Sequence, residues 1–166
     1  MRKLVVVLIA TLVIQFAMQD AGACGDKTMR VKTGLRYYQT QAANHPSTIL
    51  IHSAALPAGK AVELKEFLNK VGHKATAIDG VGRIESSLRT SHYDLVITNL
   101  AAAPELQKQV DSFTPKTLVV PVLFKQPKSE EKTAAKQYKV IVNNPRDGID
   151  FLVAVSRVMK SLSKKS

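Results

Sequence analysis

The sequence predicts a doubly wound α/β domain with a single five-stranded parallel sheet, in the order 2-1-3-4-5, and helices on both faces. Three observations lead to this prediction. Five short apolar runs alternate with segments whose apolar residues recur at helical spacing. The runs are apolar almost throughout, as in parallel strands that are covered on both faces. Five β-α units in succession favour the flavodoxin-like strand order.

The five predicted strands are bounded by turn residues or by the start of a helix. They are Thr48–Ile51, Lys74–Ile78, Asp94–Thr98, Thr117–Phe124 and Lys139–Val142. Asp79-Gly80 supplies the turn that ends the second strand. Pro121 lies inside the fourth strand and removes one backbone donor, so we expect an irregular stretch there.

A helix is predicted after each strand, because apolar residues recur there at helical spacing. The expected helices cover 59–71, 83–90, the segment from Pro104 through Phe113, the segment after Ser129, and 147–162. Gly72 is expected to stop the first of these helices, and Pro104 fits a first helical turn. Ser129 and Asp147 are expected to cap the last two.

The N-terminus has the three parts of a secretory signal. Arg2 and Lys3 precede a mainly apolar run over residues 4–18, and Ala21-Gly22-Ala23 offers the small residues that a signal peptidase reads. A buried helix or a membrane anchor is the alternative, but the run is shorter than the roughly 20 apolar residues of a typical span. We therefore expect residues 1–23 to be removed and the protein to be exported to the periplasm or cell envelope.

Cys24 is the only cysteine, so an intrachain disulfide is not possible. It directly follows the expected cleavage site, where it resembles the lipid-modified cysteine of bacterial lipoproteins. Ala21 and Asp20 depart from that pattern. Two interpretations stay open: membrane attachment through a lipid on Cys24, and a cleavage site that is followed by an unmodified cysteine.

Cleavage would leave 143 of the 166 residues, which is enough for one domain with a substantial core. We expect an N-terminal leader segment over 24–46, a domain over 47–162 and a basic tail over 163–166. The leader is predicted to contain a short helix that ends near Asn44. Three apolar or aromatic residues of that helix are expected to dock on the core: Leu35, Tyr37 and Tyr38.

The chain is strongly basic. Cleavage would remove two of 24 basic residues and one of 13 acidic residues, so the formal net charge changes from +11 to +10. Such a charge favours anionic partners, although dispersed lysines also keep a protein soluble. Charge concentrates at the two ends of the mature chain, at Lys27, Arg30, Lys32 and Arg36 and at Lys160, Lys164 and Lys165. We expect an envelope protein or an anionic surface as the partner, and do not expect nucleic acid.

Two segments carry a resemblance to a known family. They are YDLVITNL, residues 93–100, as the third strand, and VIVNNPRDGIDFLVAV, residues 140–155, as the fifth strand and last helix. With these segments, residues 47–162 resemble a two-component receiver domain. The resemblance implies the doubly wound fold that the periodicity also predicts.

Receiver domains transfer a phosphoryl group to a carboxylate, beside acidic residues that hold Mg²⁺, a hydroxyl and a lysine. The corresponding positions of this chain are His52 and Ser53 for the acidic pair, Asn99 for the nucleophile, Leu123 or Phe124 for the hydroxyl, and Asn144 for the lysine. None of them has the required chemistry. The resemblance therefore implies a receiver-like scaffold without phosphotransfer. No enzymatic activity, cofactor or metal is expected, and binding of an envelope partner is the leading functional hypothesis.

Two alternatives depend on the carboxyl ends of the strands, where ligands bind in open parallel sheets. His52, Ser53, Asn99 and Asn144 are expected to converge there and to bind a small molecule or an anion. A weak hydrolase at the same crevice is the other alternative, although the sequence shows no nucleophile elbow.

The remaining motifs are weaker. Residues 54–61 stand where a phosphate-binding loop would lie, but Ala54 and Ala61 replace its first glycine and its metal-binding hydroxyl. Gly59-Lys60 is therefore interpreted as a helix start that can hold a small anion weakly. The four histidines form no closely spaced pair of metal ligands.

The chain is expected not to accept a phosphoryl group from acetyl phosphate in the presence of Mg²⁺. Asn99 has no carboxylate, and His52 and Ser53 do not replace an acidic metal-binding pair. Measurement of the intact mass after incubation tests this expectation, and a stoichiometric phosphate adduct would contradict it.

Overall fold

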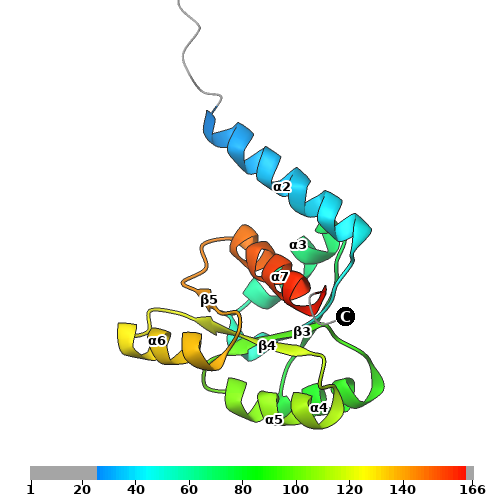
Figure 1. The fold of residues 1–166 in the computed structure, drawn as a ribbon, viewed down its shortest axis with the longest axis vertical. Coiled ribbons are helices and arrows are strands. Elements are labelled where there is room, and N and C mark those ends of the chain that lie inside the picture. The colour runs from blue at the N-terminus through cyan, green and yellow to red at the C-terminus, as the bar shows by residue number, and fades with distance from the viewer. Residues whose placement is uncertain (1–25, 164–166) are drawn as a thin grey trace, which may run out of the picture. The chain divides into compact units, whose positions relative to one another are not determined.

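A computed structural model describes residues 26–163 of the chain and confirms the predicted fold class (Figure 1). Five parallel strands form one sheet in the order β2-β1-β3-β4-β5. The strands are β1 (Thr48–His52), β2 (Lys74–Ile78), β3 (Leu95–Asn99), β4 (Leu118–Leu123) and β5 (Val142–Asn143). The predicted signal peptide, Cys24 and the last three residues of the basic tail lie outside the described residues.

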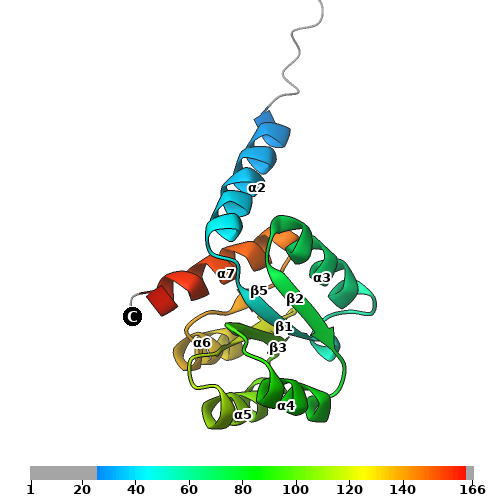
Figure 2. The same cartoon turned by 90° about the vertical axis from the view of Figure 1, so that its right-hand side faces the viewer.

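Helices follow the strands, and one long helix precedes them. The helical elements are α2 (Asp26–Asn44), the short 3-10 helix η2 (Ser53–Ala55), α3 (Lys60–Val71), α4 (Val81–Thr90), α5 (Ala103–Phe113), α6 (Lys128–Gln137) and α7 (Gly148–Ser163). In Figure 2, α3 and α7 lie on one face of the sheet, and α4 and α5 lie on the other. The sheet is therefore covered on both faces, as the apolar strands predict.

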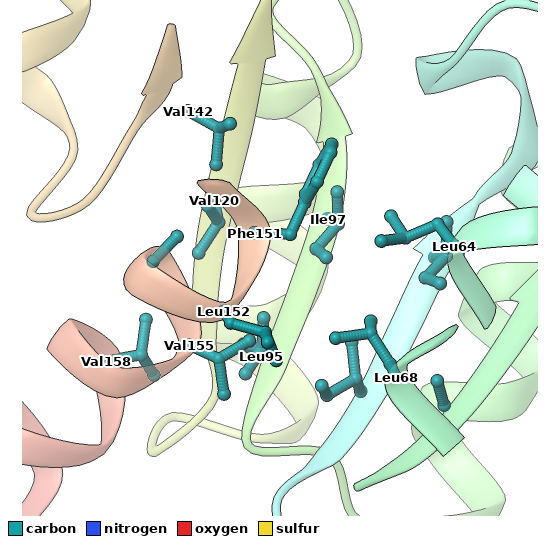
Figure 3. Close-up of a cluster of buried hydrophobic side chains, with 14 of the residues drawn as sticks. Leu64, Leu68, Leu95, Ile97, Val120, Val142, Phe151, Leu152, Val155 and Val158 are labelled. Atoms are coloured by element: carbon teal, nitrogen blue, oxygen red, sulfur yellow. The ribbon is translucent and has the colours of Figure 1, made fainter. Parts of the chain in front are cut away.

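The core has two layers, because successive side chains of a strand point to opposite faces. Ile49 and Ile51 belong to the layer under α3 and α7, and Leu50 belongs to the layer under α4, α5 and α6. Figure 3 shows the first layer, in which Leu64 and Leu68 of α3 and residues 151–158 of α7 meet the sheet. Ile49, Leu50 and Ile51 of β1 have no solvent exposure.

Most predicted helix ends agree with the structure, and one cap is wrong. Gly59 and Gly72 flank α3 in left-handed conformations, which a glycine adopts without a steric cost. The Asp147 carboxylate accepts a hydrogen bond from the Ile149 N–H at 2.9 Å, as expected of a cap for α7. Ser129 does not cap α6: Pro127 holds the cap position, no side chain caps this helix, and Ser129 lies within it.

Pro121 leaves β4 continuous, which differs from the expected irregular stretch. It pairs with Thr98 of β3, and β5 pairs only with Val122 and Leu123. The pairing between β4 and β5 thus begins after Pro121, the residue that lacks a backbone N–H. This placement agrees with the reluctance of proline to sit inside a sheet that is paired on both sides. β5 is accordingly shorter than the predicted strand.

The predicted helix of the leader segment ends at Asn44, as expected, but begins earlier than expected, at Asp26. Residues from Leu35 onward belong to the same compact unit as the sheet. Leu35 and Tyr38 pack against the core and Ala42 is fully buried. Tyr37 was predicted to dock as well, but its side chain is 56% exposed, because it lies on another side of the helix.

The edge strand β2 is covered locally by one side chain. The Asn69 amide donates to the Ala75 carbonyl at 3.2 Å, and its oxygen accepts from the Ala75 N–H at 2.7 Å. A carboxamide in this position satisfies both backbone groups that a neighbouring strand would otherwise pair. Exposed edges are templates for association, so this contact both stabilises the edge and blocks it.

Replacement of Asn69 with alanine is expected to lower the free energy of unfolding by about 1–2 kcal/mol, since two backbone groups lose their partners. Urea unfolding measures the change, and sedimentation tests whether the opened edge self-associates. Glu66→Ala, at an exposed position of the same helix, is the control. Equal stability of Asn69→Ala and wild type would contradict the role of this amide.

A buried histidine links β1 to the start of β2. His73 is 8% exposed, and its Nδ1 accepts the N–H of Ser47 at 3.2 Å. Burial lowers the pKa of His73 below the ordinary value of 6.5, and the charge of Asp94 opposes this shift. Protonation would put a hydrogen on Nδ1 facing the Ser47 donor. The contact therefore requires the neutral imidazole.

Stability is expected to fall as the pH decreases from 7.5 to 5.5. The unfolded chain takes up a proton near pH 6.5, whereas folded His73 resists it, so the stabilisation is complete above 6.5 and is lost as the pH falls toward the lowered pKa. His73→Asn keeps an acceptor near Ser47 and removes this titration, which should make the profile less steep; His52, whose pKa burial also lowers, supplies the remaining slope. Exposed His45→Asn is the control; urea unfolding at both pH values supplies the measurement. A profile that stays as steep in His73→Asn as in wild type would exclude this origin.

Candidate functional site

The structure brings three of the four predicted site residues together. His52 and Asn99 end the neighbouring strands β1 and β3, and Ser53 begins η2 directly after β1. The Asn99 amide donates to the Ala54 carbonyl of η2 at 3.2 Å. Asn144 lies at the same edge of the sheet but follows β5, with β4 between it and this group.

His52 is enclosed rather than open to a crevice. Its side chain is 4% exposed, and Nδ1 lies 3.1 Å from the hydroxyl oxygen of Thr98. Burial lowers the pKa of His52, and the charge of Asp79 acts in the opposite direction. The hydrogen-bond partner is a hydroxyl instead of a carboxylate, so no acidic group orients this imidazole for general base catalysis.

The two asparagines hold loops at the ends of the strands. The Asn99 oxygen accepts the N–H of Ala102 at 2.8 Å, while its amide nitrogen binds Ala54. Asn144 has a φ of 44°, in the left-handed region that asparagine tolerates better than most residues. Its side-chain oxygen accepts the Lys125 N–H at 2.6 Å, which ties the end of β4 to the end of β5. Ligand binding by these four residues stays a prediction.

A pocket of about 440 Å³ opens at the carboxyl end of the sheet. Its walls come from the segment after η2, the first turns of α3, the residue after β4, and the segment that leads from β5 into α7. The lining residues are Leu56, Pro57, Lys60, Glu63, Leu64, Phe67, Phe124, Pro145, Arg146, Asp147, Gly148 and Phe151. None of the four predicted ligand-binding residues lines it.

The walls of the pocket are mainly apolar, with three phenylalanines. Leu64 and Phe151 project from α3 and α7 over the same face of the sheet (Figure 3). Phe67 lies so close to Gly148 that a Cβ atom at position 148 would stand 2.4 Å from its ring. Gly148 therefore permits the contact between the two helices. Phe124 is 37% exposed, so part of the apolar lining faces solvent.

The charged residues of the pocket differ in whether they have partners. Lys60 binds Glu63 at 2.6 Å, and the Asp147 carboxylate accepts the backbone N–H of Ile149. The guanidinium of Arg146 has no partner among residues 26–163, although its backbone N–H binds Asp150. Arg146 is thus the cation that remains available to a ligand.

Two helices begin at this pocket, α3 at Lys60 and α7 at Gly148. Helix N-termini carry a partial positive charge, which here is partly offset by Asp147 at the start of α7 and Glu63 in the first turn of α3. No hydroxyl, thiol or imidazole lines the pocket, so it offers no nucleophile of those kinds. The arrangement suits an anion with an apolar body.

Within the described part of the chain, no set of three or more histidine, cysteine or acidic residues is grouped so that it could hold a metal ion. Over the same residues, no helix combines the length and the apolar character needed to cross a bilayer. Comparison with protein-family models, curated proteins and solved structures found no match to this chain.

The sequence predicted a site at the carboxyl ends of the strands, but it did not predict which residues line the pocket there. Only Gly59-Lys60 was interpreted as an anion-binding helix start, and Lys60 does line it. Phe124 directly follows β4, and Arg146 stands three residues after the end of β5; their place after the strands is the signal that was available. Phe67 and Phe151 occupy helical apolar stripes, where a pocket wall and a core residue have the same pattern.

Proposed function

We propose that this chain is a non-enzymatic, receiver-like binding domain, exported to the periplasm or cell envelope, that takes a small amphipathic anion in the pocket at α3 and α7. The observation that carries the proposal is an apolar pocket whose one unpaired cation, among the residues described, is Arg146. The ligand's apolar body would contact Phe67, Phe124 and Phe151, and its acid group would meet the guanidinium.

The size and composition of the pocket support a small ligand. A volume of about 440 Å³ falls within the roughly 300–1,000 Å³ of small-molecule sites, which are mostly apolar with a few polar groups. A guanidinium forms paired hydrogen bonds with a carboxylate or phosphate, which fixes the orientation of the ligand. Arg146 is exposed, so we expect the charge to contribute modestly to affinity.

Binding without catalysis is supported by the hydrogen bonds of the receiver-like positions. Asn99 and Asn144 use their carboxamides to hold loops, and His52 is occupied by Thr98. The pocket itself is lined mainly by apolar side chains, and no hydroxyl, thiol or imidazole is among them.

The full-length chain is expected to bind 4-phenylbutyrate more tightly than the uncharged 4-phenylbutyramide, because only the carboxylate interacts with Arg146. Arg146→Gln should weaken phenylbutyrate binding by about 3–10-fold and leave the amide unchanged. Arg157→Gln, an exposed arginine of α7 outside the pocket, is the matched control. Amide shifts in ¹H–¹⁵N spectra give both the affinity and the location.

Gly148→Ala tests the apolar wall separately. The added methyl group must displace the Phe67 ring, so binding of both probes should weaken. Gly82→Ala has open space around the new Cβ atom and is the control. Shifts confined to His52, Ser53 and Asn99, or affinities that neither pocket variant changes, would place the site elsewhere.

A further inference from the structure

The helix α6 carries three lysines in one line. Lys128, Lys132 and Lys136 are four residues apart, so they follow one another along the same side of the helix. All three side chains are exposed, and none has a hydrogen bond or ion pair with any residue in 26–163. We call these three residues the α6 lysine face.

Two other helices of this chain each pair a cation within one turn. Lys60 binds Glu63 in α3 at 2.6 Å, and Arg89 binds Glu85 in α4 at 2.8 Å. In α6, Glu131 lies three residues after Lys128, the spacing of the Lys60–Glu63 pair, but no ion pair joins these two side chains. At about 100° per residue, Glu130 points to the side of the helix opposite Lys128 and Lys132.

The lysines do not contribute to the packing of α6. Ala134 is its only buried residue, and it lies two positions from Lys132, roughly 200° around the helix. The α6 lysine face therefore points away from the sheet. Like charges four residues apart weaken a helix slightly. A row of exposed cations on the side away from the sheet is complementary in charge to an anionic surface.

We propose that the α6 lysine face docks on an anionic phospholipid surface. The line spans about 12 Å, which is eight residues at 1.5 Å each. That reach covers several neighbouring headgroups, and an ammonium group suits phosphate as a point charge. The exposed side of α6 has no large apolar residue, so the helix rests on the headgroups without inserting.

A bilayer fits this face better than nucleic acid does. The helix has neither arginine nor an aromatic side chain, the groups that grip and stack on nucleic acids. This surface is separate from the pocket, since no residue of α6 lines it. The docking proposal therefore does not depend on the proposed ligand.

The test measures sedimentation of the full-length chain with vesicles. Vesicles of phosphatidylcholine alone measure the binding that is due to the apolar N-terminal run. Vesicles with 30% phosphatidylglycerol, roughly a typical anionic fraction, measure the additional binding that is due to negative charge. Each lysine near such a surface contributes about fivefold. Replacement of all three residues of the α6 lysine face with glutamine should thus reduce the gain on anionic vesicles by about 100-fold at low salt.

A matched variant removes the same charge elsewhere. Lys74, Lys108 and Lys116 are exposed and lie on β2, on α5 and in the turn before β4. Their triple replacement with glutamine should reduce vesicle binding far less. Glutamine keeps the helix propensity of lysine and removes the repulsion, so the α6 variant should unfold at an unchanged or higher temperature.

Three results would overturn the proposal. The α6 variant could bind anionic vesicles as tightly as wild type, or both triple variants could lose the same amount, which would indicate net charge alone. Alternatively, duplex DNA could compete at phosphate concentrations far below those of the lipid, which would make nucleic acid the preferred partner. Should the triple variant fail to fold, Lys132→Gln alone is expected to show a loss of about fivefold on the same vesicles.

Discussion

The burial of β1 and β3 on both faces is the constraint on which the rest of the structure depends. Ile49, Leu50 and Ile51 are fully buried, and alternate residues enter opposite layers of the core. Both layers need helices, so each connection must cross a face of the sheet and return parallel. That requirement places the carboxyl ends of all five strands at one edge. The polar residues that follow the strands lie along that edge, and those that follow neighbouring strands come close together, whatever their chemistry.

Asparagine side chains and one glycine determine the structure of the edge at the carboxyl ends of the strands. The carboxamides of Asn99 and Asn144 close the loops that follow β3 and β5, with bonds to backbone groups of Ala102 and Lys125. Gly148 lets the first turn of α7 approach Phe67 of α3. The loops are thereby fixed while the space next to them stays open, and the pocket results from this combination. The hydrogen bonds of both carboxamides thus serve the architecture of this edge.

The sequence predicted the fold well because periodicity and strand composition depend on burial alone, which repeats along each element. It predicted less of the site, since side-chain partners come from distant segments. His52 was placed correctly at the end of β1, but its enclosure by Thr98 follows from the pairing of β1 with β3. The contact between Gly148 and Phe67 joins residues that no local pattern relates. The predicted docking of Tyr37 and the predicted cap at Ser129 were wrong for a similar reason. Tertiary contacts set the side on which a helix packs and the residue at which it starts.

Both proposed binding surfaces, the pocket with Arg146 and the α6 lysine face, contain cations that have no partner within the described residues. Arg89 shows how this chain satisfies a cation in its fold: it binds Glu85 and lies 3.9 Å from the centre of the Phe113 ring. Arg146 and the α6 lysine face lack such contacts within the described structure, and removal of their charge would leave the core intact. Solvated cations cost little where they are isolated, but lysines repeated every four residues repel one another. A charge pattern that weakens its own helix is poorly explained by folding, and complementarity to an external anion explains it directly.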